Sequence, residues 1–135
     1  MLQIQRNIRM LDGRPIGILL LHGTIDSIDS WKLERAIDEI YAQEVFDIVL
    51  DVGQVSHVSS AGWSVIVSKL SLLGEKRGFF RFCSMRTEVR KVFEIVGLEL
   101  IPGIQSHADV DIALAACRST VLNQRSRRPP AAIPT

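Results

Sequence analysis

Three short apolar runs constrain the fold of this chain more than any other feature of its sequence. They are residues 16–21, 46–52 and 79–83, and a segment with apolar residues at helical spacing follows each of them. Nearly continuous apolar runs of this length are typical of strands that are covered on both faces, as in parallel sheets. Their alternation with amphipathic helices predicts an α/β domain.

The remaining elements complete the predicted order as β-β-α-β-α-β-α-β-α. An alternating strand at 2–10 and the turn residues Asp12-Gly13-Arg14-Pro15 precede a strand at 15–22, which predicts an N-terminal hairpin. The elements expected after it are helix 28–42, strand 46–52, helix 60–73, strand 79–83, helix 89–96, strand 98–101 and a helix that carries Val110 to Cys117. We therefore expect a mixed sheet of about five strands, parallel in its later part and packed with about four helices.

Capping residues set the expected helix boundaries. Asp26 and Ser27 are candidate N-caps of the first helix, and Ser106 is the candidate N-cap of the last. Gly74 and Gly97 are placed to end the second and third helices, because glycine is the preferred residue just beyond a helix C-terminus.

One domain accounts for most of the chain. The sequence has 135 residues, 47% of them apolar, which is enough to build a core without disulfides or metal. The predicted domain is 1–118. Residues 119–135 lack a core-facing pattern and are predicted to form a disordered tail. The two cysteines, Cys83 and Cys117, lie in apolar patterns and are expected to pack in the core.

Charge and hydropathy exclude several classes of function. The formal net charge is +1, so no basic field is present that would attract nucleic acid. No apolar run approaches the ~20 residues of a membrane-spanning helix, and the N-terminus lacks the pattern of a secretory signal. We expect a cytoplasmic protein without membrane insertion.

The most informative segment leads from the third strand into the second helix, over residues 51–63. It is expected to leave a buried strand, pass through a loop and enter the helix at Ser60. A serine at a helix start can cap a free backbone N–H group. The same position lies in the positive potential of the helix N-terminus, which favours a phosphate group. Ser60 is therefore a candidate for capping and for phosphorylation.

Three motifs give the chain a resemblance to a known family, the STAS domains of bacterial anti-sigma factor antagonists. Residues 21–26, Leu-His-Gly-Thr-Ile-Asp, resemble the family pattern L-x-G-x-[LI]-D. Residues 51–62 resemble the pattern D-[LV]-x-x-[VI]-x-[FY]-[IM]-D-S-[SA]-G, and residues 89–98 resemble V-x-[KR]-[LV]-[LF]-x-x-x-G-L. With the matching order of elements, the resemblance covers residues 2–118.

The resemblance implies a partner-switching protein. Members of the family bind an anti-sigma factor that is also a serine kinase. That kinase holds the ATP and phosphorylates a serine at the start of the second helix, and a phosphatase of the PP2C type reverses the reaction. Matched residue by residue, the acceptor is Ser60, and Asp26, His57, Ser59 and Gly62 form its surroundings and the partner contact. No cofactor is implied.

Two departures from the family pattern affect this interpretation. Ser59 stands where the family has Asp, which removes a charge beside the acceptor and makes Ser59 a rival acceptor. Trp63 stands where the family usually has Leu or Ile. The alternative function is a STAS protein that does not switch, either a stressosome-like scaffold or a small subunit of a lipid transporter.

Other readings of the polar residues are weaker. His22, His57, Asp26 and Ser60 lie at strand ends and allow a Ser-His-Asp site in principle, but the G-x-S-x-G turn that exposes a nucleophile is missing. The three histidines lack metal-ligand spacing. We therefore predict no enzyme activity and no metal. Trp63 falls on an apolar helical stripe and is expected in the core, whereas Trp31 suits core or interface equally.

Overall fold

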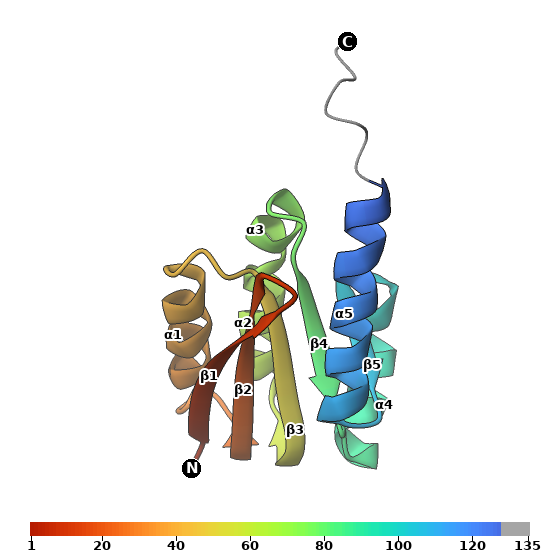
Figure 1. The fold of residues 1–135 in the computed structure, drawn as a ribbon. Helices are drawn as coiled ribbons and strands as arrows, with labels where there is room; N and C mark the ends of the chain where they lie inside the picture. The colour runs from red at the N-terminus through yellow and green to blue at the C-terminus, as the bar shows by residue number, and fades with distance from the viewer. Residues whose placement is uncertain (128–135) are drawn as a thin grey trace.

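The computed structural model describes residues 1–127 and contains the predicted mixed sheet (Figure 1). Its strand order is β1-β2-β3-β4-β5, with β1 antiparallel to β2 and the other neighbours parallel. The strands are β1 (Gln3–Leu11), β2 (Arg14–Ile25), β3 (Asp47–Val58), β4 (Phe79–Cys83) and β5 (Ile104–His107). The predicted hairpin and parallel strands are thus confirmed.

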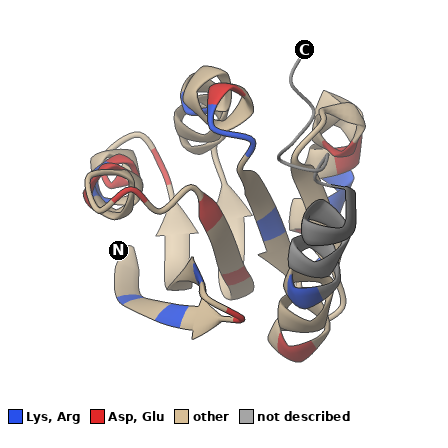
Figure 2. Cartoon of the chain, turned by 45° about the horizontal axis from the view of Figure 1, so that its top comes forward, with Lys and Arg blue, Asp and Glu red and all other residues tan. Residues whose placement is uncertain are grey.

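Helices cover both faces of the sheet unequally (Figure 2). One face packs against α1 (Ser30–Tyr41), α2 (Ser60–Ser68), α3 (Leu70–Glu75), α4 (Thr87–Val96) and the 3-10 turn η1 (Leu98–Leu100). Among residues 1–127, the opposite face is covered by α5 (Val110–Arg127) alone, whose Ala113, Leu114 and Cys117 pack on β2, β3 and β4. None of the helices within residues 1–127 is long and apolar enough to span a bilayer.

Strands β2 and β3 are longer than their apolar runs predict. The expected ends were residues 22 and 52, but pairing continues to Ile25 and Val58 through register shifts after Leu20 and Gly23. Over this end of β3 only one face is buried, so Val55 and Val58 are buried while Ser56 and His57 are exposed. A strand that is covered on one side only does not have a continuous apolar pattern. Residues 53–58, which the sequence predicts to be a loop, therefore belong to β3.

The prediction for residues 98–109 is wrong in two respects. Residues 98–100 form η1, and the fifth strand is Ile104–His107, so Ser106 lies in a strand. Asp109 caps α5 instead, because its Oδ1 accepts a hydrogen bond of 2.8 Å from the backbone N–H of Ile112. The short apolar segment before Pro102 supplies Leu98 to the core without joining the sheet.

The predicted helix 60–73 is present as two segments, so the four predicted helices appear as five. It breaks at Lys69, next to Ser68, whose hydroxyl donates to the carbonyl of Val65 at 2.7 Å, a contact that bends helices. Gly74 lies inside α3 and does not end it. Gly97 does end α4, with a φ of 78° in the left-handed region, as predicted.

The predicted boundary at residue 118 falls inside α5, which continues to Arg127. The rest of the predicted tail, residues 128–135, lies outside the described residues. The end of the domain and the disorder of the tail therefore remain predictions.

Candidate functional site

The carboxyl ends of β2 and β3 bring the first two predicted motifs together. The backbone N–H of Ser59 donates to the carbonyl of Ile25 at 2.8 Å, which fixes the start of α2 beside the end of β2. Asp26 follows Ile25 directly, and Ser60 follows Ser59. The residues that the sequence analysis selected at 26 and at 57–62 thus lie at one edge of the domain.

Ser59, and not Ser60, caps α2. The Ser59 backbone is extended, with φ −78° and ψ 171°, and its Oγ accepts a hydrogen bond of 3.4 Å from the backbone N–H of Gly62. Ser60 is the first residue with helical conformation, and its side chain is exposed. The expectation that Ser60 caps the helix is wrong by one residue. The correction leaves the Ser60 hydroxyl free of a structural role in the cap.

Asp26 organises the chain between β2 and α1. Its Oδ1 accepts hydrogen bonds from the backbone N–H groups of Ile28 at 3.0 Å and Asp29 at 2.9 Å. The expectation that Asp26 or Ser27 is the N-cap of the first helix is wrong, because α1 begins at Ser30 with Asp29 in the N-cap position. Asp26 instead holds the turn that precedes the helix. Its carboxylate is engaged with this backbone and not with the hydroxyl of Ser60.

Gly62 is a packing residue. It is buried, and a Cβ at this position would lie 2.7 Å from Cγ2 of Ile25 and 2.8 Å from Cγ1 of Val58. Both distances are far below an ordinary carbon–carbon contact. Only glycine lets the first turn of α2 approach the ends of β2 and β3 this closely, so Gly62 fixes the start of α2 against the two strands.

The three histidines are dispersed. His57 is exposed near the end of β3, in register with Thr24 of β2, and His22 is exposed further back along β2. His107 lies in β5, with its Nε2 3.0 Å from Nη1 of Arg81. Within residues 1–127 no three His, Cys, Asp or Glu side chains gather in the manner of a metal site.

An apolar groove runs from Ser60 between α2 and α4. It has a volume of about 500 Å³ and is lined by Val58, Ser60, Trp63, Ser64, Val67, Ser68, Val92 and Val96. Val67 and Val96 are each about half exposed, at 48% and 49%. The sequence does not reveal this exposure, because an exposed apolar residue at helical spacing has the same pattern as a buried one.

The two tryptophans differ in their surroundings. Trp63 is buried, as predicted, with its ring centroid 6.3 Å from that of Phe82 and 6.2 Å from that of Phe93. It anchors the floor of the groove. Trp31 is 55% exposed on α1, away from the groove.

The cysteines are core residues, as predicted. Cys83 and Cys117 are buried between the sheet and α5. Burial raises the pKa of the Cys83 thiol to about 12, and nearby acidic groups add to the shift. Sequence reasoning did not single out their neighbour Arg81, which is 2% exposed with its guanidinium carbon 4.2 Å from the centroid of Phe79. An arginine inside the run Phe-Phe-Arg-Phe-Cys was the available signal.

Comparison with known proteins supports the resemblance drawn from the motifs. The model of the STAS domain family matches residues 7–116. A relative described as an anti-sigma factor antagonist, BtrV of Bordetella bronchiseptica, is 31% identical over 106 residues, which cover 78% of this chain and 88% of that protein.

Solved structures share the fold. An anti-sigma factor antagonist from Mycobacterium paratuberculosis is 25% identical, with a TM-score of 0.69 over 86% of this chain and 95% of that one. The Bacillus cell fate determinant SpoIIAA, solved in a phosphorylated form, is 20% identical, with a TM-score of 0.63 over 84% of this chain and 100% of that one. Together with the family match, these likenesses show that the chain belongs to the STAS domain family and, within it, to the anti-sigma factor antagonists.

Proposed function

We propose that this protein is a partner-switching antagonist that binds an anti-sigma factor with serine kinase activity and is released by phosphorylation of Ser60. The observation that carries the proposal is the position of Ser60. Its side chain is exposed in the first turn of α2, at the end of an apolar groove, and a different residue caps the helix. Relatives named as anti-sigma factor antagonists support the kind of partner.

The position of Ser60 suits the chemistry of phosphoryl transfer. The kinase would transfer the γ-phosphoryl group of its ATP to the Ser60 Oγ, which loses its proton, with ADP as the other product. The new group carries about −1.5 to −2 charges, which the positive end of the α2 dipole tolerates. The antagonist supplies only the acceptor and needs no cofactor, and hydrolysis by a PP2C-type phosphatase restores the hydroxyl.

The groove beside Ser60 explains how phosphorylation would weaken partner binding. Val67, Val92 and Val96 offer apolar contact area beside Ser60, and a partner helix or loop seated there would exclude water from the hydroxyl. A phosphate at that point would have to be desolvated on binding, at a cost of several kcal/mol unless it is paired. Phosphorylation would therefore lower affinity without unfolding the domain. A partner of this kind also places the protein in the cytoplasm.

Ser59 is the less suited acceptor. Ser59 is half-buried, and its Oγ accepts the hydrogen bond from Gly62, so a kinase would have to displace the helix cap to reach it. The two serines therefore separate into a structural one and a reactive one.

A phosphorylation assay tests the proposal. The protein is incubated with ATP and an anti-sigma factor serine kinase from the same organism, and its intact mass is measured. We expect the mass of one phosphate to be added to the wild type and to Ser59→Ala, and none to Ser60→Ala. Phosphate on Ser60→Ala but not on Ser59→Ala would move the switch to Ser59. A wild type that takes up no phosphate would favour the non-switching scaffold or transporter subunit.

A further inference from the structure

Strand β1 presents an open edge. It lies at the end of the sheet, and within residues 1–127 only β2 pairs with it (Figure 2). Its nine residues pair with β2 without a register shift, and it contains no proline. Natural proteins usually shorten, bend or cover such an edge, because its free N–H and C=O groups can pair with another strand.

The hairpin turn shows which backbone groups face outward. Leu11 pairs with Arg14 across a two-residue turn, in which Asp12 has a φ of 53° and Gly13 a φ of 84°. These values belong to a type I′ turn, whose flanking residues exchange hydrogen bonds with each other. The odd-numbered residues of β1 therefore bond to β2. The even-numbered ones direct their N–H and C=O groups to the open edge, and these are Ile4, Arg6, Ile8 and Met10.

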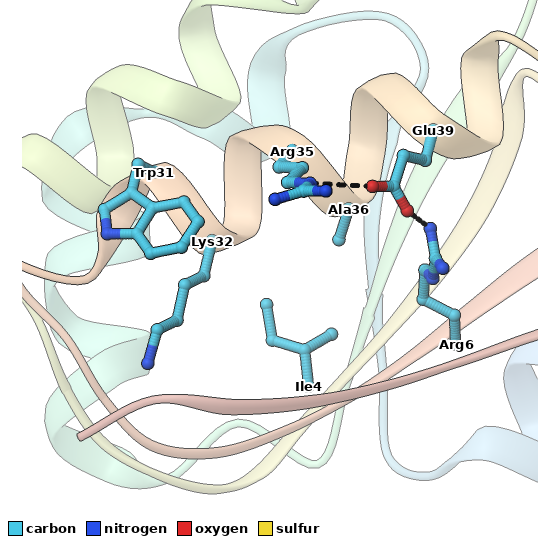
Figure 3. A pocket seen from close by; sticks show the side chains of 7 residues that line it. All are labelled: Ile4, Arg6, Trp31, Lys32, Arg35, Ala36 and Glu39. Atoms are coloured by element: carbon cyan, nitrogen blue, oxygen red, sulfur yellow. Dashed lines mark hydrogen bonds and ion pairs between the residues drawn. The ribbon is translucent and has the colours of Figure 1, made fainter.

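A pocket lies above one end of this edge, between β1 and α1 (Figure 3). Its volume is about 220 Å³, and its lining includes Ile4 and the half-exposed Trp31. At the other end of the strand, Met10 is 63% exposed. Ile4 and Met10 point to the same face of the sheet, since even-numbered residues of a strand share a face. The strand therefore carries two exposed apolar features. At one end is a hollow lined by Ile4, Trp31 and charged side chains of β1 and α1, and at the other end is the exposed side chain of Met10.

These features complement each other in an antiparallel pair of two β1 strands centred on Asn7. In that register Met10 of each copy lies opposite Ile4 of the other, beside Trp31. Arg6 lies opposite Ile8 and Gln5 opposite Arg9, so no like charges face each other. About eight backbone hydrogen bonds would form, two for each opposed pair of even-numbered residues. Centring the pair on Arg6 instead would place two arginines opposite each other.

We propose that the protein forms a symmetric dimer through β1, which joins two five-stranded sheets into one. An acidic peptide suits this edge less well than a second copy, because Glu39 already forms ion pairs with Arg6 and Arg35 in the pocket. The dimer leaves the groove beside Ser60 open, since α4 packs over β3 and β1 lies at the edge of the sheet. Each dimer would carry two separate partner sites.

Cross-linking tests the register of the dimer. In the proposed pair Asn7 lies opposite itself without a direct hydrogen bond, at a Cα separation of about 4.5 Å that a disulfide can bridge. We expect Asn7→Cys to form a covalent dimer on mild oxidation. Gln5→Cys, the matched control on the same face of the same strand, should form no covalent dimer, because its opposite residue is Arg9. Cys83 and Cys117 are buried and should not interfere.

Light scattering on the full chain supplies the second measurement. We expect twice the 15.1 kDa mass of the chain. Met10→Lys should raise the dimer dissociation constant by more than about tenfold, because each copy loses a methionine side chain that the dimer would bury. Ile112→Lys on α5, also an exposed apolar residue, should leave the dimer unchanged, with circular dichroism confirming that both variants fold. A wild type that stays at 15.1 kDa up to its solubility limit would overturn the proposal. So would cross-linking of Gln5→Cys as readily as Asn7→Cys, or a dimer that Asn7→Cys does not cross-link.

Discussion

At the scale of single residues, two adjacent serines have different tasks. Ser59 closes the N-terminus of α2 through its bond to Gly62, while the Ser60 side chain faces outward. The sequence predicts that a hydroxyl caps this helix, because serine is a preferred N-cap. It does not predict which serine does so, since β3 is longer than its apolar run and its true end shifts the start of the helix. The hydrogen bond from Gly62 identifies Ser59 as the cap, and Ser60 remains the proposed acceptor.

This division predicts different losses of stability for the two alanine variants. Ser59→Ala removes the bond to Gly62 and should lower the free energy of unfolding by about 1 kcal/mol. Ser60→Ala removes an exposed hydroxyl and should change it by less than about 0.5 kcal/mol. Urea unfolding measures both. A larger loss for Ser60→Ala than for Ser59→Ala would contradict the cap assignment.

A matched pair of glycines tests the packing beneath the site. Gly62→Ala forces a methyl group against Ile25 and Val58 and should lower the free energy of unfolding by about 1–3 kcal/mol. Gly74→Ala meets nothing within 4 Å in α3 and should stabilise the protein, by up to about 1 kcal/mol. Thermal unfolding of the two variants should therefore shift in opposite directions. A stable Gly62→Ala protein would mean that α2 does not approach the strand ends as described.

At the scale of elements, the sequence predicts the strand segments that are buried on both faces. It does not predict the strand segments that are buried on one face only. The apolar runs in β2, β3 and β4 have apolar side chains on both faces, and the sequence predicts each of them as a strand. Strand β5 contains Gln105 and His107, which turn toward Arg81, so its pattern is not that of a covered strand. The apolar residues at 98–101 fit the pattern of a strand better, although residues 98–100 form η1. Pairing with a neighbour, which local pattern does not record, decides between the two segments.

The contact between β4 and β5 predicts a pH dependence of stability. Burial, and then the charge of Arg81, lowers the pKa of His107, so the folded protein resists its protonation. The unfolded chain takes up this proton near pH 6.5, so stability is full above that pH and is lost as the pH falls toward the folded pKa. We expect the free energy of unfolding to fall between pH 8 and pH 5.5, and to fall less in His107→Gln.

Urea titrations at several pH values, kept above pH 5, provide the measurement. The buried carboxyl of Asp47, whose pKa burial raises, acts in the opposite sense, which is why the more acidic range is avoided. An unchanged pH dependence in His107→Gln would exclude His107 as its source.

At the scale of the whole molecule, the fold places its proposed surfaces apart. The Ser60 groove lies between α2 and α4, and the open edge of β1 lies at the end of the sheet (Figure 1). The family and the position of Ser60 follow from motifs in the sequence. The groove cannot be predicted from the sequence, because Val67 and Val96 lie at the same helical spacing as the buried side chains beside them. Only the packing of α4 against α2 separates the exposed valines from the core.

A charged substitution in the groove should weaken partner binding and leave the protein folded. Val96→Lys places a charge among apolar lining residues and should weaken binding of the anti-sigma factor by at least about tenfold. Ile112→Lys is the matched control, since both side chains are 49% exposed and Ile112 lies on α5. Surface plasmon resonance compares them. Equal effects of the two variants would show that the groove is not the docking surface.

The most direct test of the central claim, that Ser60 is the switch, is calorimetric titration of the anti-sigma factor with wild type, Ser60→Ala and Ser60→Glu. Ser60→Ala should bind as the wild type does, because the hydroxyl has no structural role. Ser60→Glu should bind about 30- to 1000-fold more weakly, since its charge must be desolvated in the interface at a cost of ~2–4 kcal/mol. Wild-type affinity in Ser60→Glu, with both variants folded, would contradict the account.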